Sequence, residues 1–180
     1  MPHNILEGKK GIIFGALDDK SIAWKTAEAV KRQGGEFVLT NAPVAMRMGA
    51  IKDLADKTNS IVIPADATQL EDLENLIDQS VSHLGGKLDF VLHAIAYSDK
   101  EELKGSYVDT SRDNFARTMD ISVYSFTAVA RRAAAMMDGN GSLLTLTYYG
   151  AERVMPHYNV MGVAKAALEA SIRYLSLIHI

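Results

Sequence analysis

The sequence predicts an α/β fold in which a parallel sheet is covered by helices on both faces. Short apolar runs bounded by turn residues recur along the chain, and each is followed by a longer segment with apolar residues three and four positions apart. Runs that are apolar throughout indicate strands buried on both faces, and the helical segments between them supply right-handed crossovers. This alternation is typical of a doubly wound, Rossmann-type sheet.

Each element follows from its own part of this pattern, and the length of 180 residues fits one domain. The apolar runs predict strands at 11–14, 36–40, 60–63, 90–95 and 142–147. The helical spacing predicts helices at 22–32, 44–56, 70–84, 112–137 and 159–175. The longest polar, irregular stretch, 98–111, follows the fourth strand, where ligand crevices form in such sheets.

Composition excludes several functional classes. Lys and Arg total 19 against 22 Asp and Glu, and no stripe gathers the basic residues, so a small-molecule partner is expected rather than nucleic acid. The absence of cysteine excludes disulfides and thiolate metal sites, and His83, His93 and His157 lack clustered acidic partners, so no metal is expected. No run of about 20 apolar residues and no secretory signal is present, so a soluble, cytoplasmic protein without membrane contact is expected.

The turn after the first predicted strand is a candidate dinucleotide site. Glycine permits close approach of a pyrophosphate there, and backbone N–H groups at the following helix start attract an anion. The turn holds one glycine, Gly15, and therefore fails the G-x-G-x-x-G pattern. Ser21 is able to cap the helix and to donate its hydroxyl to a phosphate. A phosphate site and an ordinary capped loop both remain open on these grounds.

The ends of the second and third strands bear on which cofactor is bound. Dinucleotide enzymes place an acid after the second strand for a ribose hydroxyl, or an arginine for a 2′-phosphate. Positions 40–43 hold neither, and the first basic residue beyond them is Arg47, which favours NADH over NADPH. Asp66 closes the third strand and is able to accept a hydrogen bond from an adenine amino group. Taken alone, Asp66 is more simply a turn or N-cap residue.

A tyrosine and a lysine seven positions apart mark the candidate catalytic segment. On one helix, Tyr158 and Lys165 would lie on nearly the same face, about 10 Å apart along the axis. Such a pair is able to hold a cofactor ribose and a substrate carbonyl along one line. Without further context, the same spacing is more often the boundary of an amphipathic helix.

Nearly the whole chain resembles the divergent branch of the short-chain dehydrogenase/reductases that contains the bacterial-type enoyl-acyl-carrier-protein reductases. Standard members space tyrosine and lysine as Y-x-x-x-K, which would put tyrosine at position 161, where this chain has Met161. The enoyl reductase branch uses Y-x-x-x-x-x-x-K, as here. The matching stretches are Gly15 with 21–23, 120–122 with 124–126, 143–146 through 150–153, and 158–162 with 164–166.

The resemblance implies an NADH-dependent enoyl-ACP reductase, which reduces the 2,3 double bond of trans-2-enoyl-ACP thioesters in the last reductive step of fatty acid elongation. It implies that Tyr158 donates a hydrogen bond or proton to the thioester carbonyl, and that Lys165 binds the nicotinamide ribose and favours the developing oxyanion. Tyr148 matches the second active-site tyrosine, and Ser98 an acyl-substrate contact. The implied cofactor contacts are Gly15, Ser21, Ile22, Ala42, Asp66, Ala67, Ile95 and Lys165.

The family continues through further strands and a lid, so the fold is expected to be incomplete at the C-terminus. Residues 1–175 would form a partial reductase domain, and 176–180 a tail unlike the family. Exposed apolar sheet surface is then expected, and this chain alone is expected to lack full catalysis, whereas the full-length protein would be a homotetramer. Two alternatives remain: a carbonyl-reducing short-chain dehydrogenase and a non-catalytic dinucleotide-binding fragment.

Overall fold

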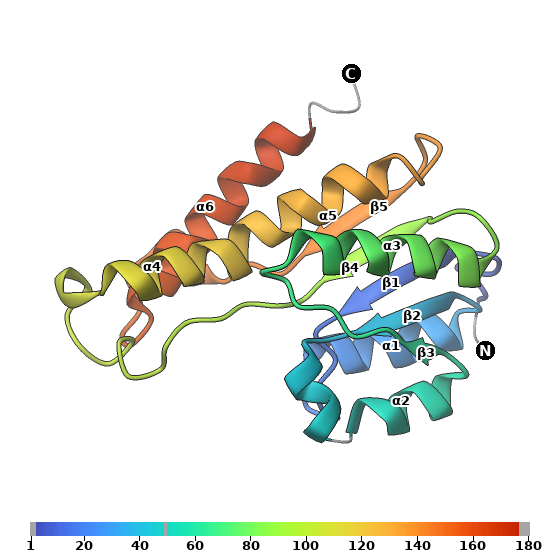
Figure 1. Cartoon of the computed structure of the whole chain (residues 1–180), viewed down its shortest axis with the longest axis horizontal. Helices are drawn as coiled ribbons and strands as arrows, with labels where there is room; N and C mark the ends of the chain where they lie inside the picture. The colour runs from blue at the N-terminus through green and yellow to red at the C-terminus, as the bar shows by residue number, and fades with distance from the viewer. Residues whose placement is uncertain (1–2, 49, 177–180) are drawn as a thin grey trace. The chain divides into compact units, whose positions relative to one another are not determined.

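The computed structural model describes residues 3–48 and 50–176. The chain divides into two compact units (Figure 1). The first, here called the sheet unit, comprises Met1–Ala94 and Val129–Thr145. The second, here called the helical unit, comprises Ile95–Ala128 and Leu146–Ile180. The predicted tail at 176–180 lies outside the described residues except for Ser176.

A five-stranded parallel sheet in the order β3-β2-β1-β4-β5 forms the centre of the sheet unit. Its central strand β1 pairs with β2 on one side and with β4 on the other, and the strand order reverses between these two pairs. This arrangement confirms the predicted doubly wound sheet. The strands are β1 (Lys10–Phe14), β2 (Glu36–Thr40), β3 (Ile61–Val62), β4 (Phe90–His93) and β5 (Ser142–Thr145).

Helices cover both faces of this sheet, as predicted. Figure 1 shows α3 (Leu70–Leu84) on one face, and α1 (Ile22–Arg32) with α2 (Ala50–Thr58) on the other. Ile12 and Ile13 point to opposite faces of β1, and both are fully buried. The hydrophobic core therefore lies on both sides of β1, which explains why its sequence is apolar at every inner position.

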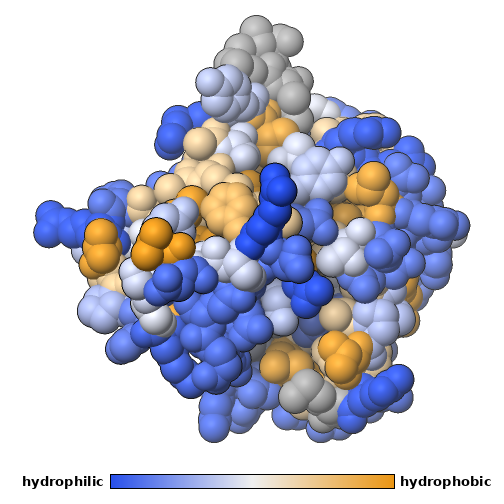
Figure 2. All heavy atoms as spheres, turned by 60° about the vertical axis from the view of Figure 1, so that its left-hand side comes forward, coloured by the Kyte–Doolittle hydropathy of each residue, from blue (hydrophilic) through white to orange (hydrophobic). Residues whose placement is uncertain are grey.

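Three helices dominate the helical unit: α4 (Arg112–Met119), the first part of α5 (Ser125–Ala134), and α6 (Asn159–Leu175). The short helices η2 (Tyr107–Asp109) and η4 (Tyr149–Ala151) lie in the connections. Large apolar side chains of this unit are exposed, among them Val108, Val154 and Tyr174. The surface in Figure 2 shows apolar side chains in small groups among hydrophilic ones.

Two predicted helices are wrong in extent. The continuous helix at 112–137 is instead α4, a π-helical turn η3 (Asp120–Tyr124) and α5, because one extra residue per turn is accommodated there. The helix at 44–56 is instead a 3-10 helix, η1 (Pro43–Met48), followed by α2, which runs on to Thr58. The sequence has glycine at position 49, and glycine weakens a continuous helix.

Three strands, β3, β4 and β5, are shorter than predicted, and β4 ends level with the last residue of its neighbour β1. The ladder between β4 and β5 runs from Phe90 paired with Ser142 to His93 paired with Thr145. β5 is an edge of the described sheet, and its Leu144 is 50% exposed. Leu144 lines an apolar groove of about 360 Å³ together with Leu92 and Phe90. The sheet therefore presents apolar surface in the described structure.

Among the described residues, no helix is long and apolar enough to cross a membrane.

Candidate active site

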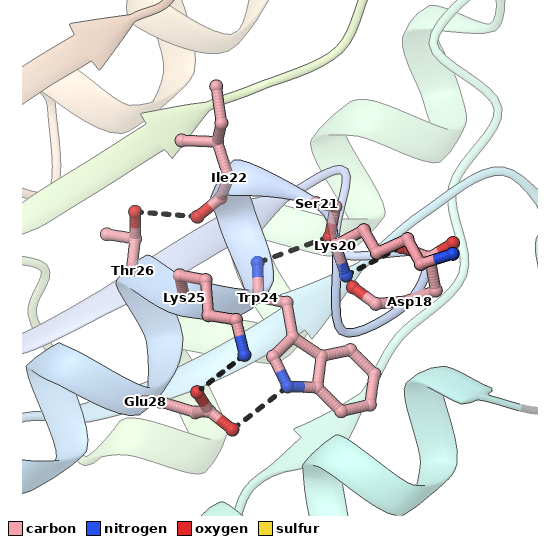
Figure 3. Close-up of polar contacts among 8 residues, drawn as sticks. All are labelled: Asp18, Lys20, Ser21, Ile22, Trp24, Lys25, Thr26 and Glu28. Atoms are coloured by element: carbon pink, nitrogen blue, oxygen red, sulfur yellow. Dashed lines mark hydrogen bonds and ion pairs between the residues drawn. The ribbon is translucent and has the colours of Figure 1, made fainter.

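The turn between β1 and α1 is held by Ser21 (Figure 3). The Ser21 hydroxyl oxygen accepts hydrogen bonds from the backbone N–H of Trp24 at 3.4 Å and of Leu17 at 3.3 Å. Its own proton is donated to the carbonyl oxygen of Asp18 at 2.8 Å. The predicted N-cap is thus confirmed. To donate to a phosphate, the Ser21 hydroxyl would have to give up its hydrogen bond to the Asp18 carbonyl oxygen.

The start of α1 offers donors for an anion. The backbone N–H groups of Ile22 and Ala23 have no acceptor among the described residues, and the Ile22 side chain is 64% exposed. Gly15 has a φ of +88°, a conformation that side chains rarely adopt, and its N–H donates to the carbonyl of Thr40. A helix start with open N–H groups after such a turn fits a phosphate-bearing cofactor.

Asn41, which the sequence analysis did not single out, joins this turn to the end of β2. Its side-chain amide donates to the carbonyl oxygen of Ala16 at 3.1 Å, and its oxygen accepts from the N–H of Ala42 at 2.9 Å. The candidate cofactor residue Ala42 is therefore fixed by its neighbour. Asparagine is common in turns after strands, so its presence at position 41 did not indicate a special role.

Asp66 follows β3 and stabilises a turn through one of its two carboxylate oxygens. Oδ1 accepts from the N–H and the hydroxyl of Thr68, at 2.9 and 2.8 Å. Ala67, the next candidate cofactor residue, is half-buried. The turn interpretation of Asp66 is therefore confirmed. An adenine contact through Oδ2 stays a prediction.

In the helical unit, Tyr158 is the N-cap residue of α6, and two glycines make room for it. A Cβ at Gly150 would lie 2.5 Å from Cδ1 of the Tyr158 ring, and a Cβ at Gly162 would lie 2.8 Å from the carbonyl oxygen of Gly150. Both distances are shorter than real contacts allow, so η4 and α6 approach this closely only with glycine at both positions. The glycines therefore place the Tyr158 ring.

The phenol of Tyr158 lies beside a second tyrosine. The rings of Tyr148 and Tyr158 meet edge to face with centroids 4.8 Å apart. The pKa of Tyr158 is raised above its ordinary value of 10.0, mainly by burial and further by the neighbouring Tyr148. The phenol consequently keeps its proton at neutral pH and is able to act as a hydrogen-bond donor.

Lys165 extends from α6 to the segment that follows β5. Its ammonium donates to the carbonyl oxygen of Leu146 at 2.7 Å, and the residue is 6% exposed. Burial lowers the pKa of Lys165 below its ordinary value of 10.5. One turn further along α6, Glu169 accepts from the Thr147 hydroxyl at 2.5 Å. Two side chains of α6 thus hold residues 146–147, directly before Tyr148.

Met161 stands where standard short-chain dehydrogenases have their tyrosine. It is 6% exposed, and its sulfur lies 4.0 Å from the hydroxyl of Ser122. Tyr158, in contrast, is half-buried and lines a groove of about 340 Å³ together with Gly150 and Val163. The position reachable by a ligand is therefore 158 rather than 161.

The remaining candidates of the helical unit are Ile95 and Ser98. Ile95 is half-buried, and the Ser98 hydroxyl lies 3.3 Å from Oδ1 and 3.2 Å from Nδ2 of Asn114. Within each unit the predicted residues fall on loops and helix starts that follow strand ends, except Lys165, which lies inside α6. No group of three or more histidine, aspartate or glutamate side chains suited to a metal occurs in the described parts of the chain. The sheet unit holds Gly15, Ser21, Ile22, Ala42, Asp66 and Ala67, and the helical unit holds Ile95, Ser98, Tyr148, Tyr158 and Lys165.

Comparison with known proteins identifies the family. A family model described as "Enoyl-(Acyl carrier protein) reductase" matches residues 15–178. The chain is 54% identical to enoyl-[acyl-carrier-protein] reductase [NADH] 1 of Rhizobium meliloti, over 96% of this chain and 63% of the relative. It is 46% identical to the [NADH] reductase of Rickettsia conorii, over 98% of this chain and 67% of that protein.

Solved structures agree with this assignment. The enoyl-(acyl-carrier-protein) reductase of Anaplasma phagocytophilum in complex with NAD matches with a TM-score of 0.90 and 50% identity, over 95% of this chain and 65% of the other. The reductase of Alistipes finegoldii matches with a TM-score of 0.93 and 47% identity, over 98% and 66%. This chain thus spans slightly less than two thirds of the length of these structures and of the Rhizobium protein. It belongs to the enoyl-(acyl carrier protein) reductase family.

Proposed function

We propose that this protein is an NADH-dependent enoyl-ACP reductase, which reduces the 2,3 double bond of trans-2-enoyl-ACP thioesters during fatty acid elongation. The observation that carries the proposal is Tyr158, a protonated phenol held by Gly150 on the helix that also carries Lys165. The spacing of seven residues and the family membership point to the same reaction. The chain spans 63% of the length of the Rhizobium relative, so activity is tested on a protein extended to that length.

In this mechanism, Tyr158 stabilises the charge that develops on the thioester oxygen. Addition at the β-carbon turns the carbonyl into an enolate, so a donor at that oxygen contributes most in the transition state. The raised pKa of Tyr158 keeps the proton available for donation to the enolate. Lys165 adds a positive charge from the same helix. Tyr148, in edge contact with Tyr158, would restrict the orientation of its ring.

In the sheet unit, the loop and helix-start residues would contact the cofactor, and in the helical unit Ile95 and Lys165 are the candidate cofactor contacts. The open N–H groups at the start of α1 support pyrophosphate binding, and Lys165 would bind ribose hydroxyls. When bound, the nicotinamide supplies the hydride for the β-carbon. The absence of a basic residue at 40–43 and the NADH in the names of the relatives favour NADH over NADPH.

We also infer the setting in which the protein works. The family match extends through both units, so residues 1–175 would belong to one reductase domain. An acyl-carrier-protein thioester would be the substrate, and the cytoplasm the location. The full-length protein would be a homotetramer.

Substrate comparison tests the proposal against a carbonyl-reducing dehydrogenase. The chain, completed with the C-terminal third of a relative, is assayed for NADH consumption with crotonyl and acetoacetyl thioesters. Consumption with the crotonyl thioester alone is expected, and Tyr158→Phe should slow it by about 100-fold or more, the usual loss of an oxyanion donor. Consumption with the acetoacetyl thioester alone would contradict the proposal. Cofactor binding without turnover of either thioester would favour a non-catalytic domain.

A further inference from the structure

Asn159, which follows Tyr158 directly, fastens the loop at 98–111 to the start of α6. Its side-chain nitrogen donates to the carbonyl oxygens of Gly105 at 2.9 Å and Glu102 at 3.2 Å. Both protons of one amide are thereby used, on partners more than 50 positions away in the sequence. The φ of Asn159 is 34°, in the left-handed region that asparagine adopts more readily than most residues. The backbone conformation and the amide donors together suit asparagine at this position.

The same loop is fixed on its other side by the carboxylate of Glu102. This carboxylate accepts from the Ser111 N–H at 2.9 Å, from the Ser111 hydroxyl at 2.7 Å and from the Asn114 amide at 3.1 Å. The bonds from Ser111 are the main cause that lowers the pKa of Glu102, so the carboxylate stays ionised and keeps accepting. Glu102 therefore ties the loop to the start of α4 through its side chain and to α6 through its carbonyl.

Asn114 carries this network on to Ser98. Asn114 is only 7% exposed. Its Oδ1 accepts hydrogen bonds from the N–H of Asp99 at 2.9 Å and from the hydroxyl of Ser98 at 3.3 Å. A continuous set of hydrogen bonds thus runs from the residue beside Tyr158, through Glu102 and Asn114, to Ser98. Hydrogen-bond networks with satisfied donors and acceptors rigidify the segments that they join, and here the Asn114 end of the network is buried.

We infer that Asn159 is a positioning residue for the substrate: it fixes the loop at 98–111 against α6, so that Ser98 stays at a set position relative to Tyr158. The inference rests on the proposed function in taking Ser98 as an acyl contact. Since Tyr158 donates to the thioester oxygen and Ser98 contacts the acyl part, a loop free to move would weaken substrate binding without removing the reacting phenol.

Two substitutions separate the anchoring role from the helical role of Asn159. In Asn159→Asp the shape is kept, but a carboxylate cannot donate to carbonyl oxygens, whereas its charge favours a helix start. In Asn159→Gly the positive φ is tolerated and the donors are lost. Asn59→Gly is the matched control, because Asn59 also has a positive φ, of 49°, and is exposed.

Hydrogen exchange of the 180-residue chain is the deciding measurement. We expect backbone amides of the loop to exchange about tenfold faster in Asn159→Asp and Asn159→Gly, the effect of losing one or two hydrogen bonds, while Asn59→Gly leaves them unchanged. Unchanged exchange in Asn159→Asp would overturn the inference. Equal acceleration throughout α6 would also overturn it, because Asn159 would then stabilise the helix rather than the loop.

Steady-state kinetics of the completed reductase tests the consequence for the substrate. Asn159→Asp is expected to raise KM for the enoyl thioester several-fold with kcat nearly unchanged, which is the signature of lost binding rather than lost chemistry. An unchanged KM would overturn the positioning role. A parent protein without reductase activity would refute the proposed function and the substrate role alike, whereas the loop anchoring is decided by exchange alone.

Discussion

A methyl group added at Gly150 should displace the Tyr158 ring, which makes Gly150→Ala a direct test of the site. The new Cβ would lie 2.5 Å from Cδ1 and 2.8 Å from Cε1 of the ring, whereas ordinary contact begins at 3.4 Å. The ring must therefore move by about 1 Å, and a displacement of that size costs on the order of 100-fold in turnover. The strain itself should cost about 1–3 kcal/mol of stability.

The assay is the rate of enoyl thioester reduction by the completed enzyme, with thermal unfolding measured in parallel. The matched control is the same substitution in the Tyr158→Phe background. Because the phenol is already absent there, Gly150→Ala should lower the rate by little more, and the two losses should not add. Nuclear magnetic resonance should also show the contact between the Tyr148 and Tyr158 rings weakened. A folded Gly150→Ala protein with turnover within about threefold of the parent would refute this reasoning.

Three further predictions follow from the same contacts. As pH rises, activity should fall at a pH below 10.5, because burial lowers the pKa of Lys165 and its ammonium loses its charge there; Lys165→Arg, which keeps its charge, should move this fall upward. The unfolded chain binds more protons than the folded one between that lowered pKa and 10.5, so unfolding measurements should show Lys165 contributing stability that rises with pH there. Ser21→Ala should lower the free energy of unfolding by about 1 kcal/mol through loss of the cap, as denaturant titration would show, and Ser21→Thr should restore most of it. Glu169→Ala should remove the hydrogen bond that holds Thr147, and should lower turnover while changing the free energy of unfolding little. Glu169→Gln, which still accepts this hydrogen bond, should retain most of the activity.

The order and type of the main elements were predictable because hydrophobic periodicity records burial. Ile12 and Ile13 are apolar because β1 is covered on both faces, and α1 and α3 begin and end as their spacing indicates. The helix expected at 112–137 hid the π-helical turn at Asp120–Tyr124, since that turn is defined by backbone hydrogen bonds, which the apolar pattern does not record. Strand ends were overestimated because pairing ends with the neighbouring strand rather than with the apolar run.

The geometry of the candidate site was predictable where it depends on spacing along one helix, and not where it depends on long-range contacts. Tyr158 and Lys165 stand out through their separation on one helix. The closeness of Gly150 to the Tyr158 ring depends on how η4 packs on α6. The hydrogen bonds of Asn159 go to a loop more than 50 residues earlier in the chain, and no local sequence pattern predicts them. The family resemblance supplied residue roles that periodicity alone left open.

The position of the transferred hydrogen in the product tests the central claim most directly. The completed enzyme is given NADH deuterated at the reactive carbon together with a trans-2-enoyl thioester, and the product is examined by mass spectrometry and nuclear magnetic resonance. The account predicts a saturated thioester that carries deuterium on its β-carbon, formed far more slowly by Tyr158→Phe. Deuterium at a carbinol carbon formed from a carbonyl group, or no transfer with either NADH or NADPH, would contradict it.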